Sequence, residues 1–443
     1  MVRLFDGTLP PGVKGGVFLA LLIAPCLAWA VFGAGETVLD GPGDDRRGYE
    51  RPDFQTRSLA LQVRVGAPAD LVARASQPVL GLPPLAIPEY NPLNQERVVL
   101  GRKMFFDRRL SLNGTQSCAM CHIPEQGFTN NELATAVGIE GRSVGRNTPT
   151  LYNVAYMHSL FHDGRDETLE QQAWQPLLHR NEMANPSIGY VLRKLESLPD
   201  YGGLFEAAFD GRGPDLGNVP KALAAYQRTL LSGNSRFDRW YFGAEEGALS
   251  ESEIRGFALF TGSGNCISCH TIEADHALFT DQEMHNTGVG FHRSQRRSIQ
   301  GSRVLIAPGV FVNVTEETIR SVGRPMPPDL GRYRVTGDPE DRWAFRTPGL
   351  RNVALTGPYM HDGSLSTLSA VVEFYNRGGE PNPLQDDRIG PLGLGPQERA
   401  DLVAFLHSLT GEYRELVTDA FAAPIGDVGV ERHLFSPKPG VSP

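Results

Sequence analysis

The hydrophobic pattern of the chain is helical. Ser250 and Glu253 form a capping-box pair, and the apolar residues that follow recur every three or four positions until Gly262 and Gly264 interrupt them. This pattern predicts a helix between Ser250 and Gly262. We find no series of alternating apolar and polar positions that would indicate a sheet. The expected fold class is therefore mainly α, loop-rich and with little strand.

Two further segments predict helices. Asn91 is expected to cap one of them, with Pro92 at its first position and apolar residues continuing to Phe105. The other runs over Pro396–Leu409, with its apolar residues on one side and Gly411 as its stop. Glycine and proline are plentiful between such segments, as is typical of loops that wrap around a cofactor.

The longest apolar run lies near the N-terminus, at residues 17–32. It is short for a membrane span and ends in an A-x-A cleavage pattern. Residues 1–35 therefore fit either a cleaved signal peptide or an uncleaved N-terminal anchor, and residues 36–83 fit a tether. Both interpretations predict a protein exported to the bacterial periplasm.

Four of the five cysteines fall in two pentapeptides of the form Cys-x-x-Cys-His, which is the attachment signature of c-type haem. The thiols add to the vinyl groups, and the histidine becomes the proximal iron ligand. A zinc site made from both cysteine pairs is the alternative. Because the motifs are 148 residues apart and each has its own histidine, we favour two covalent haem c groups. Their predicted attachment residues are Cys118, Cys121, His122, Cys266, Cys269 and His270.

The length of the chain indicates the number of domains, and its charge limits the class of partner. A chain of 443 residues suggests two domains, and each half carries one haem motif. We expect an N-terminal haem domain over 84–244, a C-terminal haem domain over 245–413 and a tail over 414–443. The net charge of −9, with no basic run, argues against a nucleic-acid partner.

An internal repeat relates the two halves. Residues 147–169 match residues 346–368 at a constant offset of 199, which aligns His162 with His361. The haem motifs are offset by only 148, so the second half has an insertion, at about 276–345. Within this insertion, valine-rich and isoleucine-rich stretches predict a small hairpin.

The same offset of 199 residues aligns the residues that are expected to face the two haems. It places Tyr375 opposite Pro176. A phenolate can ligate haem iron, whereas proline cannot. If both residues face their haems, the first haem is open and the second is closed. The alternative for Tyr375 is an ordinary core aromatic residue.

Several longer motifs carry a family resemblance over about 85–413. LGRKMFFDRRLS, SCAMCH, GRNTPTLYN, LRNVALTGPYMHDGS and AFLHSLTG occur in this order. The chain resembles the bacterial di-haem cytochrome c peroxidases, including the methylamine-utilisation branch that matures a quinone cofactor. The resemblance implies two cytochrome-c-like haem domains packed against each other with calcium between them. It also implies that peroxide reacts at the N-terminal haem and that electrons arrive through the C-terminal one.

The resemblance assigns roles to individual residues. Glu182 matches the acid that takes a proton from peroxide and returns it to the leaving oxygen, although Glu182 alone would pass for a surface acid. Gln172 and Pro176 match the same pocket. The implied calcium ligands, all oxygen donors as calcium prefers, are Asn147 and the carbonyl groups of Thr356 and Pro358.

Three departures from the family pattern matter. Residues 123–157 lack the histidine that caps the resting iron in peroxidases that need reductive activation, so we expect an N-terminal haem that is open even when oxidised. Most of the family has a methionine ligand at the position of Tyr375, whereas the methylamine-utilisation branch has a tyrosine there, as this chain does. An anionic oxygen ligand favours ferric iron. His162 replaces a tryptophan between the haems and is either a hydrogen-bonding core residue or part of their electron path.

These features lead to three hypotheses. The first is a periplasmic peroxidase that reduces hydrogen peroxide to water with electrons from a small cytochrome c or cupredoxin. The second is an oxidase, like those of the methylamine-utilisation branch, that modifies a partner protein. The third is a di-haem electron carrier or sensor without enzymatic activity. The resemblance is also compatible with a homodimer.

Overall fold

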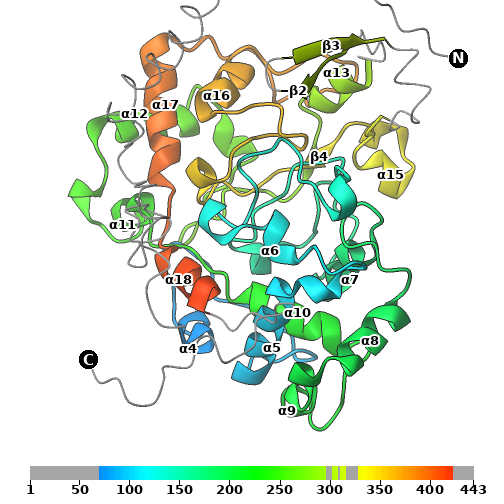
Figure 1. The fold of residues 1–443 in the computed structure, drawn as a ribbon. Helices are drawn as coiled ribbons and strands as arrows, with labels where there is room; N and C mark the ends of the chain where they lie inside the picture. Colours follow the sequence, from blue (N-terminus) through cyan, green and yellow to red (C-terminus); the bar gives the residue numbers. More distant parts are fainter. Residues whose placement is uncertain (1–68, 296–301, 308–309, 316–327, 423–443) are drawn as a thin grey trace, which may run out of the picture. The chain divides into compact units, whose positions relative to one another are not determined.

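The computed structural model describes residues 69–295, 302–307, 310–315 and 328–422 (Figure 1). These residues all belong to one unit of the chain, Val63–Pro443. The predicted signal or anchor lies outside the described residues, as does the tether up to residue 68. No helix within the described part of the chain is long and apolar enough to cross a membrane.

The fold is mainly helical, as predicted, with short strands only. The helices of the first half are α4 (Leu71–Ala75), α5 (Gln95–Phe106), α6 (Cys118–Cys121), α7 (Leu169–Leu178), α8 (Ile188–Ser197), α9 (Leu204–Ala208), α10 (Asn218–Arg228) and α11 (Arg236–Tyr241). Those of the second half are α12 (Glu251–Thr261), α13 (Val289–Gln295), α15 (Tyr333–Thr336), α16 (Leu368–Asn376), α17 (Pro396–Ser408) and α18 (Arg414–Ala422).

One pair of crossed helices forms the centre of each half. In the first half α5 packs on α10, and a Cβ added to Gly101 would collide with the carbonyl group of Ala222. In the second half α12 packs on α17 (Figure 1), and a Cβ added to Gly256 would collide with that of Asp401. Glycine therefore permits the close helix approach at equivalent points of both halves.

Each half has its own hydrophobic core. The first core includes Phe105 and Tyr226, and Leu416 of α18 also packs into it. Residues 414–422 of the expected tail are thus a helix packed on the N-terminal half. The second core includes Phe405 of α17, and Phe237 of α11 also packs into it. The domain bounds at 84–244 and 245–413 stay predictions, because both cores lie in one unit.

The predicted start of α5 is wrong by three residues. Asn94, not Asn91, is the N-cap, and its side chain accepts a hydrogen bond from the N–H of Arg97 at 2.9 Å. Asn91 is instead 1% exposed and donates to Glu170 Oε1 and to the carbonyl oxygen of Lys221. The asparagine side chain serves tertiary structure there, and the helix begins beyond it.

The other two helix predictions are confirmed. The capping box of Ser250 and Glu253 is present, and α12 ends at Thr261, just before Gly262. Helix α17 begins at Pro396 and ends at Ser408, one residue earlier than expected.

The internal repeat is also present in three dimensions. Helices α7 and α16 begin at matching positions, after N-caps at Thr168 and Thr367. Asn153 and Asn352, again 199 residues apart, both have left-handed backbones, with φ of 62° and 61°. Equivalent residues therefore share local conformation as well as sequence.

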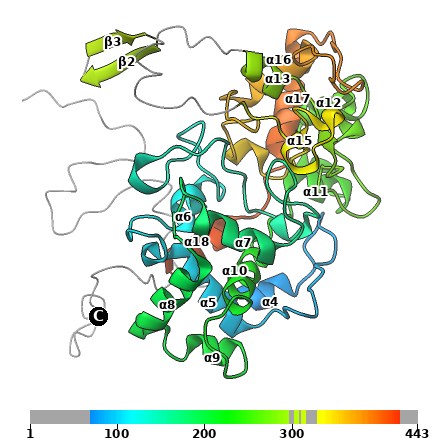
Figure 2. The ribbon, with the colours of Figure 1, turned by 90° about the vertical axis from the view of Figure 1, so that its right-hand side faces the viewer.

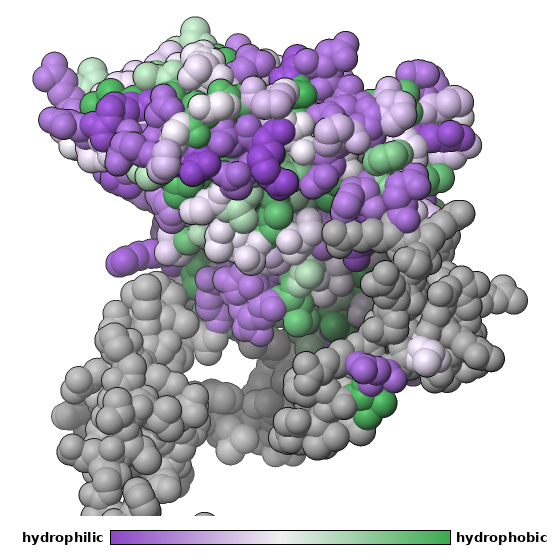
Figure 3. Space-filling model, turned by 90° about the horizontal axis from the view of Figure 1, so that it is seen from above, coloured by the Kyte–Doolittle hydropathy of each residue, from purple (hydrophilic) through white to green (hydrophobic). Residues whose placement is uncertain are grey.

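The described strands form two antiparallel pairs. Strand β1 (Met284–His285) pairs with β4 (Phe345–Arg346). Strand β2 (Ser302–Ala307) pairs with β3 (Val310–Val314), so the hairpin predicted within the insertion is confirmed (Figure 2). On the face shown in Figure 3, hydrophilic side chains predominate and the apolar ones are scattered, as expected for a surface in contact with water.

Candidate functional site

A cavity of about 2140 Å³ is lined by both Cys-x-x-Cys-His motifs. Their four cysteines form no disulfide bonds and line this cavity together with the two histidines. Residues of α7 and α16, the repeated helices, line it as well. The two halves thus present the same kinds of groups to one cavity.

The first motif forms the short helix α6. The N–H of His122 donates to the carbonyl oxygen of Cys118 at 2.9 Å, which places the imidazole beside the thiols. His122 Nδ1 lies 3.0 Å from the carbonyl oxygen of Phe128. This hydrogen bond leaves Nε2 free for iron. Burial lowers the pKa of His122, so the ring is held in the neutral form that binds a metal.

The second motif repeats this geometry on a 3₁₀ turn. The N–H of His270 donates to Cys266 at 2.9 Å, and His270 Nδ1 lies 2.8 Å from the carbonyl oxygen of Phe279. Burial also lowers the pKa of His270. In both halves, paired thiols flank a buried, oriented imidazole at the cavity wall. These residues fit two covalently attached haem c groups.

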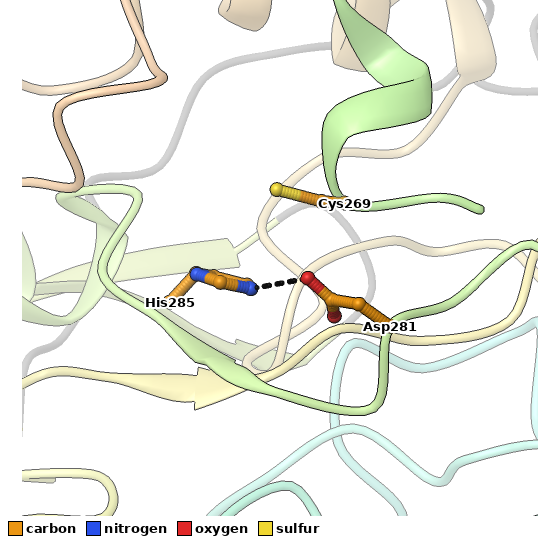
Figure 4. A group of neighbouring side chains, drawn as sticks. All are labelled: Cys269, Asp281 and His285. Atoms are coloured by element: carbon orange, nitrogen blue, oxygen red, sulfur yellow. Dashed lines mark hydrogen bonds and ion pairs between the residues drawn. The ribbon is translucent and has the colours of Figure 1, made fainter.

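The alternative of a zinc site does not fit the structure. Within the described ranges, the only group of histidine, cysteine and acidic side chains close enough to share a metal is Cys269, Asp281 and His285 (Figure 4). It contains one cysteine of one motif and neither proximal histidine. The two cysteine pairs are therefore not gathered around a common ion.

His285 in this group is saturated by carboxylates. Its Nε2 lies 2.8 Å from Asp281 Oδ2 (Figure 4), and its Nδ1 lies 2.7 Å from Asp386 Oδ2. Burial opposes protonation of the ring, whereas hydrogen bonds to the carboxylates of Asp281 and Asp386 favour it and raise the pKa of His285. Arg388 Nη2 also lies 2.8 Å from Nδ1. Both ring nitrogens therefore have side-chain partners, and neither is left for a metal.

The residues assigned to the peroxide pocket line the cavity together. Gln172 and Pro176 belong to α7, and Glu182 follows that helix. The Glu182 side chain is 29% exposed, and its Oε1 lies 3.1 Å from His179 Nδ1. Together with burial, its charge raises the pKa of Cys121 to about 11, which places the carboxylate near the first motif.

The backbone of Glu182 is fixed on both sides. Its N–H donates to the carbonyl oxygen of His179 at 2.9 Å, and its own carbonyl accepts from the N–H of Ile139 at 3.0 Å. A Cβ added to Gly138 would collide with the carbonyl group of Asn181. The sequence motif identified Glu182 but missed the contribution of His179 and Gly138, since neither shows a pattern of its own.

Tyr375 lies on α16 and lines the cavity. Its neighbour Phe374 is 3% exposed and belongs to the protein interior, whereas Tyr375 is in the cavity wall. Burial raises the pKa of Tyr375, and the nearby Cys266 and Cys269 raise it further. The side chain therefore faces the second haem motif, as iron ligation would require.

The expected calcium donors also line this cavity. Asn147 Nδ2 donates to the carbonyl oxygen of Ala134 at 3.0 Å, which leaves Asn147 Oδ1 available. Within the described chain, the carbonyl oxygens of Thr356 and Pro358 accept no hydrogen bond. Oxygen donors are the kind of ligand that calcium prefers, and calcium itself stays a prediction.

His162 lies where the two repeats meet. Its Nε2 is 2.9 Å from the carbonyl oxygen of Asn147, and burial lowers its pKa to about 3. Its own carbonyl accepts from the N–H of Arg346 at 2.8 Å. His162 also lines the cavity. These contacts fit the interpretation of His162 as a hydrogen-bonding residue.

Comparisons with known proteins identify the relatives of this chain. The family model for di-haem cytochrome c peroxidases matches residues 95–246. The chain is 37% identical to the cytochrome-c peroxidase IdrP1 of Denitromonas iodatirespirans, over 80% of this chain and 93% of the relative. It is 38% identical to the methylamine utilization protein MauG of Methylorubrum extorquens, over 73% of this chain and 81% of the relative.

Two solved structures are similar as well. One is a MauG-like protein associated with microbial copper homeostasis, with a TM-score of 0.63, 31% identity, and coverage of 78% of this chain and 97% of that one. The other is the diheme peroxidase BthA of Burkholderia thailandensis, with a TM-score of 0.56, 26% identity, and coverage of 73% and 88%.

Proposed function

The chain belongs to the di-haem cytochrome c peroxidase family, and from this premise we propose that it reduces hydrogen peroxide to water with electrons from a small redox protein. Membership in this family implies two haem c groups and an oxidoreductase. The observation that carries the finer proposal is the asymmetry of the cavity. A carboxylate, Glu182, faces the first motif, and a phenol, Tyr375, faces the second.

When bound, the haem groups supply the iron centres that exchange electrons. The protein has to orient peroxide and move its proton. Glu182 would take the proton from the oxygen next to the first haem and return it to the leaving oxygen. His179 holds this carboxylate at 3.1 Å. Each peroxide consumes two electrons and two protons and yields two molecules of water.

Two neighbours of Glu182 would shape the same pocket. Pro176 offers no atom that can ligate iron, so it leaves room for peroxide. Gln172, one helical turn earlier on α7, carries an amide that can donate a hydrogen bond to a bound oxygen. Both residues line the cavity.

Electrons would enter through the second haem. His270 and Tyr375 would both hold its iron, which would leave no position for substrate there. The donor we propose is a small periplasmic cytochrome c or cupredoxin. The apolar run at 17–32 supports export, because it fits a signal or an anchor.

A second candidate function is oxidation of a partner protein. Tyr375 in the cavity and the lack of histidine in 123–157 favour it, as does the similarity to MauG. This function would use the same open first haem, but the oxidised groups would be side chains of another protein. A peroxidase needs only peroxide and a reduced electron carrier.

Steady-state peroxide reduction tests the proposal. The purified holoprotein would be mixed with hydrogen peroxide and a reduced small cytochrome c or a reduced cupredoxin. We expect two equivalents of carrier to be oxidised per peroxide consumed. Failure of both carriers, with peroxide-dependent modification of a co-purified protein, would support the second candidate. No consumption of peroxide at all would leave an electron carrier or sensor.

A further inference from the structure

Arg346 is a guanidinium group in the cavity wall whose contacts are all with uncharged atoms. Its Nη1 lies 3.2 Å from Met157 Sδ and 3.3 Å from the carbonyl oxygen of Thr347. Its Nε lies 3.4 Å from the carbonyl oxygen of Phe161. These long contacts orient the side chain between the two repeats but do not neutralise its charge.

Two other arginines that line the cavity and lie near Arg346 or its neighbours have carboxylate partners. Arg146 pairs with Asp163 and Asp329, and Arg293 pairs with Asp362. For Arg346, no described Asp or Glu side chain makes an ion pair. Burial lowers the pKa of Arg346 to about 10, so the side chain is still charged at neutral pH. A partly buried charge without a counter-ion is unfavourable, which points to an acidic group outside the polypeptide.

The internal repeat shows that this charge is specific to the second half. Arg346 is the counterpart of Asn147. The N–H of Asn147 donates to the carbonyl oxygen of His361, and the N–H of Arg346 donates to that of His162, both at 2.8 Å. The backbones are therefore equivalent, yet one carries a neutral amide and the other a cation.

A second polar group in the same wall also lacks a partner. His361 is buried and stacks on Phe345 with ring centres 3.6 Å apart. Its Nε2 has no hydrogen bond within the described chain, although the matching nitrogen of His162 has one. Burial lowers the pKa of His361 to about 4, so the ring is neutral and Nε2 carries a proton in one of its two tautomers. Within the described chain, Arg346 and His361 Nε2 thus place two polar groups without an acidic hydrogen-bond partner in the same wall.

We propose that Arg346 binds a propionate carboxylate of one of the two haems, at the junction between the repeats. A guanidinium group and a carboxylate can form two parallel hydrogen bonds. His361 Nε2 offers a further hydrogen-bond donor in the same cavity wall. The assignment rests on the presence of two haems, as the proposed function does, but not on turnover of peroxide.

This contact would also affect electron transfer. A fixed positive charge beside a haem stabilises the ferrous state relative to the ferric state, which has one more positive charge. Removing the charge should therefore shift that haem toward the ferric form. The Arg346 side chain would stabilise the ferrous state in this way without a bound metal ion.

The test compares three variants of the holoprotein. Arg346→Gln removes the charge, and Arg346→Lys keeps it but loses the bidentate geometry. Arg293→Gln is the matched control, because Arg293 lines the same cavity but already has Asp362 as partner. Resonance Raman spectra report the propionate bending modes, and spectroelectrochemical titration reports the ferric-to-ferrous equilibrium of each haem.

In Arg346→Gln we expect a shifted propionate mode and about a tenfold shift of one haem toward the ferric form, which corresponds to 59 mV for one electron. Arg346→Lys should shift the mode and keep the potential near that of the unmodified protein. Arg293→Gln should change neither. Unchanged propionate modes in both Arg346 variants would overturn the proposal.

If haem fails to attach in Arg346→Gln, the proposal is tested by Arg346→Lys alone. A shifted propionate mode in its Raman spectrum would support the proposal, and an unchanged mode would overturn it. These spectra are recorded without peroxide. An unmodified protein that fails to reduce peroxide but shows the predicted Raman shift on substitution would therefore reject the proposed function and keep this inference. The opposite pair of results would keep the function and reject the inference.

Discussion

The backbone N–H of Asn147 donates to the carbonyl oxygen of His361 at 2.8 Å, and 199 residues later Arg346 makes the same bond to His162. Each repeat thus pairs with the other through equivalent atoms. The shared backbone positions both haem motifs in one cavity, while individual side chains differ. In the proposed function, the different roles of the two haems depend on those few side chains.

Replacement of Glu182 by Gln tests the acid–base role. The amide cannot accept and return the peroxide proton, so peroxide turnover should fall by about 10² to 10⁴-fold. Haem spectra should stay unchanged, because Glu182 does not ligate iron. The control is Glu140→Gln, at an exposed side chain paired with Arg142. Turnover in Glu182→Gln equal to that of the control would remove Glu182 from the mechanism.

Replacement of Tyr375 by Phe tests ligation of the second haem. Phenylalanine keeps the ring but lacks the oxygen, so the absorption and electron paramagnetic resonance signals of that haem should change while those of the first persist. Tyr156→Phe is the control, since its hydroxyl donates to the carbonyl oxygen of Pro83 and does not line the cavity. Identical spectra for the two variants would return Tyr375 to the role of a core residue.

Replacement of Gly256 by Ala tests the helix crossing of the second half. The new Cβ would collide with the carbonyl group of Asp401, and α12 and α17 would have to separate. The free energy of unfolding in urea should fall by about 1–3 kcal/mol. At Gly247 an added Cβ meets no atom within 4 Å. Gly247→Ala should therefore change the free energy of unfolding by less than about 0.5 kcal/mol. Equal effects would show that the crossing tolerates a methyl group.

The imidazolium of His285 predicts a pH dependence of stability. The carboxylates of Asp281 and Asp386 raise its pKa in the folded protein above the value of about 6.5 that applies when it is unfolded. The stabilisation is therefore complete below about pH 6.5 and is lost as pH rises through the higher pKa of the folded state. His285→Gln should reduce the loss of unfolding free energy between pH 6.5 and 9 by on the order of 1 kcal/mol.

The control for this effect is His276→Gln, because His276 pairs with only one carboxylate, that of the exposed Asp275. The free energy of unfolding of His276→Gln should change with pH in the same way as that of the unmodified protein over the same range. A His285→Gln profile parallel to that of the unmodified protein would mean that His285 does not carry the excess proton.

Local patterns predicted much of the fold. The capping box at Ser250 and the start of α17 at Pro396 depend on residues close in sequence, and both were predicted correctly. The N-cap of α5 was not, because Asn91 and Asn94 have similar local contexts. Contacts of Asn91 with Glu170 and Lys221, far away in the chain, decide between them.

In the candidate site, too, some features follow from the sequence and others depend on distant contacts. The haem motifs and the alignment of Tyr375 with Pro176 follow from spacing alone, and Glu182 follows from a family motif. The support of Glu182 by His179 and the unpaired charge of Arg346 depend on how distant segments meet. Nothing in the sequence reports whether an arginine has an acidic partner.

Electron paramagnetic resonance of the fully oxidised holoprotein tests the central claim most directly, namely that the His122 haem is open and the His270 haem is closed by Tyr375. We predict a high-spin ferric component from the first haem, without any prior reduction. Two low-spin signals, with no high-spin component, would contradict this account.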